Sequence, residues 1–223
     1  MSVPIYAAVL FDLDGTLYDR DALVRAIADV QYDSYRGLIP EMPRETYARR
    51  IVEMDDHGMA DKLAGYRALA AEWGRPPELG DRLLENFWAE YDRELKAPQD
   101  TRETLATLQG AGVRLGLITN GGTERQMRKL ELMELKEIFD AILVSETEGV
   151  RKPDSEIFDR ALVRLGVGPE AAVFVGDNPE ADVAGAIGAG LSAIWKYTPY
   201  GSAPLGRVPT VHRLTEVLPH CFR

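Results

Sequence analysis

The chain has 223 residues, of which 45% are hydrophobic, and a formal net charge of −10. This size and composition suit a soluble globular protein with one sizeable core, or with one core and a smaller appended unit. The excess of acid argues against a nucleic-acid polymer or an anionic membrane as partner, so a small anionic ligand would need local cations or a metal. The single cysteine, Cys221, excludes an internal disulfide and is typical of a cytoplasmic protein. We expect a monomer or a homodimer.

The first predicted element is a short apolar run, residues 7–12, which indicates a buried strand. It lacks a basic segment before it and a small-residue cleavage site after it, so we interpret it as core rather than as a signal peptide. From about residue 20 to 96 the pattern becomes charged and helix-periodic, with breaks near residues 37–43, 57–58 and 74–77. These breaks predict four helices.

From residue 98 onward, predicted helices and strands alternate. A capping-box-like start at Asp100–Glu103 begins the first of these helices. The other predicted helices are residues 123–134, 155–165 and 181–189, and the predicted strands are residues 113–119, 141–144, 172–175 and 192–197. The tail, residues 198–223, is expected to be mostly loop with one short helix. Such alternation indicates an α/β fold whose parallel sheet is covered on both faces.

The first strand is separated from its α/β partners by the helical segment. That segment is far too long for an ordinary loop, so the sequence predicts an inserted helical domain. No apolar run is long enough to span a bilayer.

Polar residues follow several of the predicted strands. Asp12 and Asp14 come at the end of the first strand, Thr119–Gly122 (TNGG) at the end of the next, and Asp177 follows residues 172–175. Ligands of open parallel sheets bind beyond the carboxyl ends of the strands. Acids two apart in a strand point to the same face, so Asp12 and Asp14 could converge on one small object.

Taken one at a time, these residues have ordinary explanations. The TNGG and GDNP segments are typical of turns, Lys152 of a solvated side chain, and Asp182 of an exposed helix start. Their joint placement at strand ends favours a single site.

The motifs FDLDGT, ITNGG, RKPD and GDNPEAD, in this order, resemble the four motifs of the haloacid dehalogenase-like (HAD) hydrolase superfamily. The resemblance extends from Asp12 to Asp182. It implies a Rossmann-like catalytic core formed by residues 1–17 and 97–223, interrupted by an α-helical cap domain, residues 18–96.

The resemblance also implies catalytic and metal-binding roles. Asp12 would be the nucleophile that forms an aspartyl-phosphate, and Asp14 would protonate the leaving group and then activate water. Asp12, the main-chain carbonyl of Asp14 and Asp177 would hold Mg²⁺. Asp182 would steady the waters of the metal, or Lys152, without touching the metal itself.

Three further residues would bind the phosphate. Thr119 and the backbone of Asn120 would hold it, with help from the amino end of the following helix. Lys152 would bridge the phosphate and Asp12 and keep the neighbouring carboxylates ionised.

We therefore predict a Mg²⁺-dependent phosphatase that acts on a small phosphorylated metabolite. DGTLYD and TNGG...Q..K are similar to the branch that contains nucleotide 5′-phosphatases and other small-metabolite phosphatases, so we expect a nucleotide 5′-phosphatase or a phosphoglycolate-type phosphatase. Three alternatives remain: a 2-haloacid dehalogenase, in which the second acid of the first motif is replaced and no metal is needed; a phosphosugar mutase; and a non-catalytic phospholigand-binding protein. Conceivable substrate contacts in or beside the cap are Tyr18, Asp19, Arg20, His57, Trp73 and Trp88.

Overall fold

The computed structural model describes residues 3–58, 60–199, 203–204 and 206–223. The chain divides into two compact units, which are described separately. The core unit comprises Met1–Tyr18 and Lys96–Arg223, and the helical unit comprises Asp19–Leu95. Within the described ranges, no helix combines the length and the apolar composition needed to cross a membrane.

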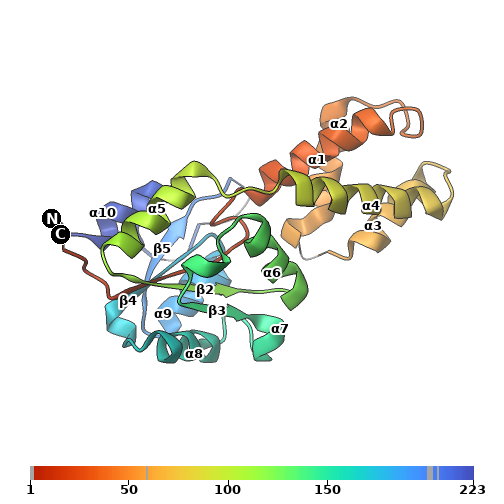
Figure 1. The fold of residues 1–223 in the computed structure, drawn as a ribbon. Coiled ribbons are helices and arrows are strands. Elements are labelled where there is room, and N and C mark those ends of the chain that lie inside the picture. Colours follow the sequence, from red (N-terminus) through yellow and green to blue (C-terminus); the bar gives the residue numbers. More distant parts are fainter. Residues whose placement is uncertain (1–2, 59, 200–202, 205) are drawn as a thin grey trace. The chain divides into compact units, whose positions relative to one another are not determined.

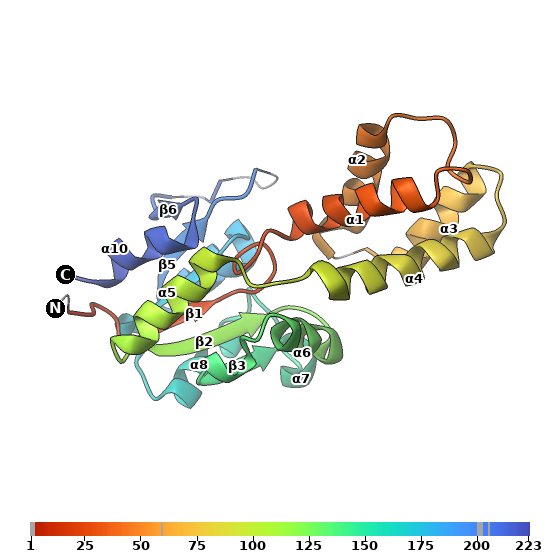
Figure 2. The same ribbon diagram turned by 45° about the horizontal axis from the view of Figure 1, so that its top comes forward.

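The core unit contains a parallel sheet of six strands in the order β3-β2-β1-β4-β5-β6, whose labels are divided between Figures 1 and 2. The strands are β1 (Ala8–Phe11), β2 (Arg114–Thr119), β3 (Ala141–Val144), β4 (Ala172–Gly176), β5 (Ser192–Lys196) and β6 (Thr210–Val211). The α/β class with a Rossmann-like parallel sheet is confirmed. The last strand, β6, was not predicted, because a two-residue strand has no periodicity to detect.

Helices cover both faces of this sheet. Helices α5 (Gln99–Gly110) and α10 (Leu218–Cys221) lie on one face, and α8 (Ser155–Leu165) and α9 (Gly185–Gly188) lie on the other (Figures 1 and 2). The remaining helical segments of the core unit are α6 (Thr123–Leu132), α7 (Ser145–Glu148), the 3-10 turns Lys136–Ile138, Pro169–Ala171 and Leu214–Val217, and a π-helical turn, Pro179–Ala184. Leu10 and Phe174 point toward α8, as the alternation of side chains along neighbouring strands requires.

Two predicted helix starts in the core unit are wrong. Helix α5 begins at Gln99, directly after Pro98, and has no side-chain cap. Asp100 therefore lies inside the first turn, where its Oδ2 accepts a hydrogen bond from Leu214 N at 3.2 Å and ties the tail to the core. The helix expected from residue 181 begins earlier, as the π-helical turn, because Asn178 caps it through the N–H groups of residues 180 and 181.

The helical unit contains the four helices that the sequence breaks predict. They are α1 (Arg20–Ser34), α2 (Arg44–Asp55), α3 (Lys62–Glu72) and α4 (Pro77–Glu94), with a 3-10 turn at Asp56–Gly58. Asp19 caps α1, since its Oδ1 accepts from Ala22 N at 2.9 Å.

One buried polar side chain links these helices. Gln31 Nε2 donates to the Leu83 carbonyl at 2.7 Å, and Gln31 Oε1 accepts from the hydroxyls of Tyr47 and Tyr66 at 3.1 and 3.0 Å. The buried amide is thereby satisfied, which a core position requires.

Candidate active site

The carboxyl ends of β1 and β4 bring three carboxylates together. Asp12 follows β1, and its N–H donates to the Val175 carbonyl of β4 at 2.9 Å. Asp177 follows β4, and Asp182 lies on the π-helical turn; one oxygen of each carboxylate lies within 4.8 Å of the others. The chain leaves β1 toward β2 and leaves β4 toward β5, in opposite directions along the sheet. The cluster therefore occupies the topological switch point, where parallel sheets bind ligands.

Lys152 lies between two of these acids. Its Nζ is 2.6 Å from Asp12 Oδ1 and 2.7 Å from Asp182 Oδ1, and the side chains of Lys152 and Asp182 are each only 2% exposed. Asn120 holds the backbone of Lys152 from both sides: its Oδ1 accepts from Lys152 N, and its Nδ2 donates to the Lys152 carbonyl, both at 3.0 Å. Lys152 is therefore not a solvated side chain, and Asp182 is not an exposed residue at a helix start.

The electrostatics of this cluster favour a cation. Burial raises the pKa of Asp12 to about 7, and Asp182 adds to the rise. Burial, and then the nearby Asp12, raise the pKa of Asp177 to about 9. Burial alone would disfavour the charge on Lys152, yet the two acids that it contacts raise its pKa overall.

Three carboxylates thus face one ammonium, and their mutual repulsion is only partly compensated. Clustered carboxylate oxygens are the ligands that Mg²⁺ prefers, so the residues present fit a hard divalent cation.

Gly15 allows Asp177 to approach the segment that follows β1. Its φ is +83°, and a Cβ at this position would lie 2.2 Å from Asp177 Oδ2. No other residue type fits without displacing this carboxylate.

The predicted phosphate-binding turn lies at the end of β2. Thr119 is buried, and its Oγ1 accepts a hydrogen bond from Gln126 Nε2 at 2.5 Å. The start of α6 is engaged differently from the expectation: Gly121 N donates to Ser145 Oγ at 3.0 Å, and Thr123 N donates to Glu146 Oε2 at 2.7 Å. Both N–H groups donate to side chains of α7, so these two groups do not support the expected contribution of the amino end of α6 to phosphate binding.

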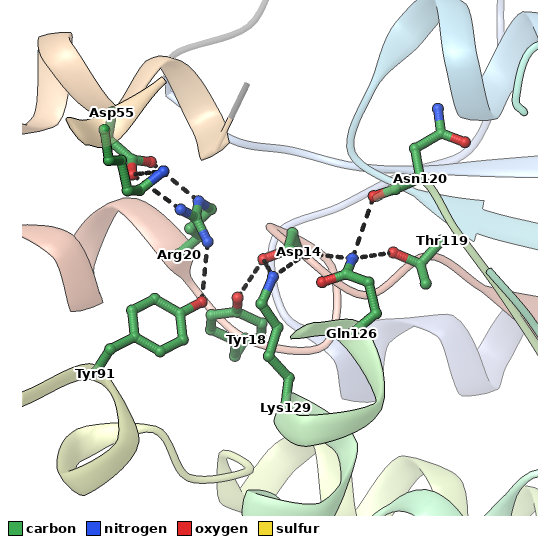
Figure 3. Close-up of polar contacts among 10 residues, drawn as sticks. Asp14, Tyr18, Arg20, Asp55, Tyr91, Thr119, Asn120, Gln126 and Lys129 are labelled. Carbon is green, nitrogen blue, oxygen red and sulfur yellow. Dashed lines mark hydrogen bonds and ion pairs between the residues drawn. The ribbon is translucent and has the colours of Figure 1, made fainter. Parts of the chain in front are cut away.

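Asp14 has partners of its own, separate from those of Asp12. Lys129 Nζ is 2.7 Å from both Asp14 oxygens, Gln126 Nε2 is 2.9 Å from Asp14 Oδ2, and the Tyr18 hydroxyl donates to Asp14 Oδ1 (Figure 3). The TNGG...Q..K pattern contains Gln126 and Lys129, but we predicted no contact for either residue. Their spacing of three along a helix was the available signal, because it places both on one face.

Arg20, one of the conceivable substrate contacts, has structural partners within the helical unit. Arg20 forms two hydrogen bonds with Asp55, at 3.1 and 2.9 Å, and one with Tyr91 Oη at 2.9 Å (Figure 3). Lys62 Nζ also contacts Asp55, at 2.8 Å. Asp21, in the first turn of α1, is buried, and burial raises its pKa.

Comparison with known proteins agrees with this architecture. Residues 6–190 match the family model described as haloacid dehalogenase-like hydrolase. The chain belongs to this family, as the four motifs implied.

Several named relatives within the family are phosphatases. The chain is 37% identical, over 84% of its length and 83% of the relative's, to a ribulose-1,5-bisphosphate 5-phosphatase of Halopiger xanaduensis. It is 35% identical, over 94% and 96% of the two chains, to the pyrimidine 5′-nucleotidase YjjG of Escherichia coli. A solved HAD phosphatase from Thermococcus onnurineus is 28% identical, with a TM-score of 0.65 and coverage of 96% of both chains.

Proposed function

We propose that this phosphatase is a Mg²⁺-dependent phosphomonoesterase that hydrolyses a small phosphorylated metabolite through an aspartyl-phosphate on Asp12. The observation that carries the proposal is the contact between the buried Asp12 and Lys152, at 2.6 Å. One carboxylate oxygen each of Asp12, Asp177 and Asp182 lies within 4.8 Å of the others, close enough to bind one metal ion. Phosphoryl transfer requires a nucleophile and positive charge around the phosphate oxygens. These four residues supply the nucleophile, one cation and the ligands for another.

Asp12 and Asp177, together with the main-chain carbonyl of Asp14, are the proposed Mg²⁺ ligands. The bound ion would supply charge neutralisation for the phosphate. Asp182 would act on Lys152, which it contacts at 2.7 Å, and through Lys152 on the orientation of Asp12.

The proposed phosphate-binding residues are Lys152, Thr119 and Asn120. Lys152 would contact both the phosphate and Asp12, and the Thr119 hydroxyl would donate to a phosphate oxygen. The Asn120 backbone would contribute as well, while its side chain keeps Lys152 in place through the two hydrogen bonds to the Lys152 backbone.

Asp14 is the proposed general acid and base. It would give a proton to the leaving oxygen as the bond to phosphorus breaks, and would then take a proton from the water that attacks the aspartyl-phosphate. The presence of both Asp14 and Asp177 favours phosphoester over carbon–halogen chemistry, since a haloacid ester intermediate needs neither.

For the substrate class, the relatives' names support phosphate esters of nucleotides, sugars and other small metabolites. We propose a nucleotide 5′-phosphatase or a phosphoglycolate-type phosphatase. We also propose that residues 18–96 are the cap domain of the family and contain the residues that distinguish among leaving groups.

Turnover of p-nitrophenyl phosphate by the pure protein, with and without Mg²⁺, tests the reaction. Asp12→Asn should abolish turnover, whereas Asp159→Asn on α8 should not change it. Rapid acid quenching followed by peptide mass spectrometry should find phosphate on the peptide that contains Asp12. Turnover that persists in Asp12→Asn would refute the nucleophile. A panel of phosphorylated metabolites then identifies the substrate.

A further inference from the structure

The side chain of Asp14 is held from several directions at once. Lys129 Nζ lies 2.7 Å from each of its two oxygens, Gln126 Nε2 lies 2.9 Å from Oδ2, and the Tyr18 hydroxyl donates to Oδ1 (Figure 3). Both oxygens therefore have donors, and rotation of the carboxylate about its bond to Cβ would break several hydrogen bonds together. Charge-assisted bonds of this kind are stronger than neutral ones.

Two of these donors come from one face of α6. Gln126 and Lys129 are three residues apart, a spacing that places their side chains next to each other on a helix. Both side chains are buried, with Lys129 only 4% exposed. Burial of a lysine is costly unless it is paired, and Asp14 is a partner that offsets this cost.

The third donor comes from the segment that carries Asp14 itself. After the turn at Gly15 the chain folds back, and Gly15 N donates to the Tyr18 carbonyl at 3.1 Å. This return brings the phenol of Tyr18 to the carboxylate four residues earlier. The geometry of the turn thus fixes Tyr18 independently of α6.

Gln126 also connects Asp14 to the phosphate-binding turn. Its Nε2 lies 2.5 Å from Thr119 Oγ1 and 3.2 Å from the Asn120 carbonyl, in addition to its contact with Asp14. A shift of α6 would therefore move the acid and the phosphate-binding turn together.

Each of the two acids of the first motif also has its own lysine. Asp12 contacts Lys152, and Asp14 contacts Lys129. Removal of Lys129 therefore leaves the ion pair of Asp12 in place.

We propose that Lys129, supported by Gln126 and Tyr18, is the positioning residue for Asp14, and that it aims this carboxylate at the leaving-group oxygen. The inference rests on the proposed function, because it assigns the orientation of the proposed general acid. Lys129 acts through Asp14, so its removal should impair proton transfer to the leaving group more than it impairs phosphate binding or attack by Asp12.

Leaving-group dependence separates this role from a structural one. Phenolate is a poor leaving group and needs a proton as the ester bond breaks, whereas 2,4-dinitrophenolate leaves without one. The ratio kcat/KM reports steps up to the first irreversible one, which is transfer to Asp12, so later hydrolysis of the intermediate does not mask the effect. We expect Lys129→Met to lower kcat/KM for phenyl phosphate by about 10- to 100-fold, and for 2,4-dinitrophenyl phosphate by less than about 3-fold.

Three further variants complete the experiment. Lys129→Arg, which keeps the charge, should restore part of the activity on phenyl phosphate. Tyr18→Phe removes one hydroxyl without changing the packing volume, and should give a selective loss of about 3- to 10-fold even if Lys129→Met fails to fold. Lys136→Met, an exposed lysine that pairs with Glu131, should leave both substrates unchanged.

The dependence on Asp14 is tested by a double-mutant cycle. In an Asp14→Asn background, Lys129→Met should cause no further selective loss, because both changes act on the same proton transfer. Equal losses on both esters, or additive selective losses in the cycle, would overturn the inference while leaving the phosphatase intact. Failure of the wild-type protein to turn over either ester with Mg²⁺ would overturn the proposed function, and the inference with it.

Discussion

Replacing Lys152 with methionine should destabilise the core unit strongly, because the ammonium is the cation that Asp12 and Asp182 contact within a buried cluster. The three side chains are 2%, 10% and 2% exposed, in the order Lys152, Asp12 and Asp182, and the two ion pairs measure 2.6 and 2.7 Å. Removing one partner from a buried pair costs about 3–5 kcal/mol, since a buried charge loses its compensation. Because about 1 kcal/mol moves the Tm of a chain of this size by about 2–4 °C, Lys152→Met should lower the Tm by about 6–20 °C.

The assay is thermal unfolding in EDTA at about pH 8, where the unfolded state keeps its carboxylates ionised. Lys136→Met is the matched control: Lys136 is 41% exposed and pairs with Glu131 at 3.0 Å, an arrangement worth about 0–1 kcal/mol. At about pH 5 the loss in Lys152→Met should shrink, because buried acids with raised pKa values take up protons and their charge disappears. A Tm decrease in Lys152→Met no larger than in Lys136→Met at about pH 8 would refute the argument from uncompensated charge.

Three other predictions concern the same cluster. Gly15→Ala should weaken Mg²⁺ binding by about tenfold or more in calorimetric titrations, because the left-handed conformation costs alanine about 1–2 kcal/mol and the new Cβ would lie 2.2 Å from Asp177 Oδ2. Gly188→Ala is the control, since a Cβ at Gly188 meets no atom within 4 Å. Equal Mg²⁺ affinities of the two variants would contradict the steric argument. The rise in Tm caused by MgCl₂ should be larger at about pH 8.5 than at about pH 6. The pKa of Asp177 is raised to about 9, so its carboxylate binds a proton in competition with the metal as the pH falls. A rise in Tm that does not depend on pH would exclude this competition. Asn120→Ala should lower the Tm by about 2–6 °C and reduce kcat on p-nitrophenyl phosphate, because the backbone of Lys152 loses two hydrogen bonds. An unchanged Tm would show that water replaces the amide of Asn120.

The parts of the fold that the sequence predicts correctly are those with a strong period and a clear end. Strands β1 to β5 are short apolar runs bounded by glycine, polar residues or charge, and their observed limits fall within two residues of the prediction. Helix α8 begins at Ser155 and ends at Leu165 as expected, because Asp154 caps it and Gly166 terminates it in a left-handed conformation. Local chemistry alone specifies these limits.

Features that depend on tertiary contacts were missed. Lys129 has the pattern of a solvated helix residue, and its burial depends on how α6 rotates against the loop after β1, which no local signal specifies. Asp21 is likewise buried, although a charged residue in the first turn of a helix is usually solvated. Asp100 has the pattern of a helix cap, yet Pro98 occupies the cap position and the helix begins at Gln99, two residues earlier than a cap at Asp100 requires.

The placement of β1 has a consequence for the order in which the site is assembled. This strand precedes all others in the chain, but it lies between β2 and β4, whose residues are made roughly 100 and 160 positions later. The ion pair between Asp12 and Lys152 joins residues 140 positions apart. During synthesis Asp12, the proposed nucleophile, therefore has neither its neighbouring strands nor Lys152 until most of the chain has emerged from the ribosome. A nascent chain that ends before β4 has an unpaired edge on its central strand, and lacks Asp177 and Asp182 of the proposed site.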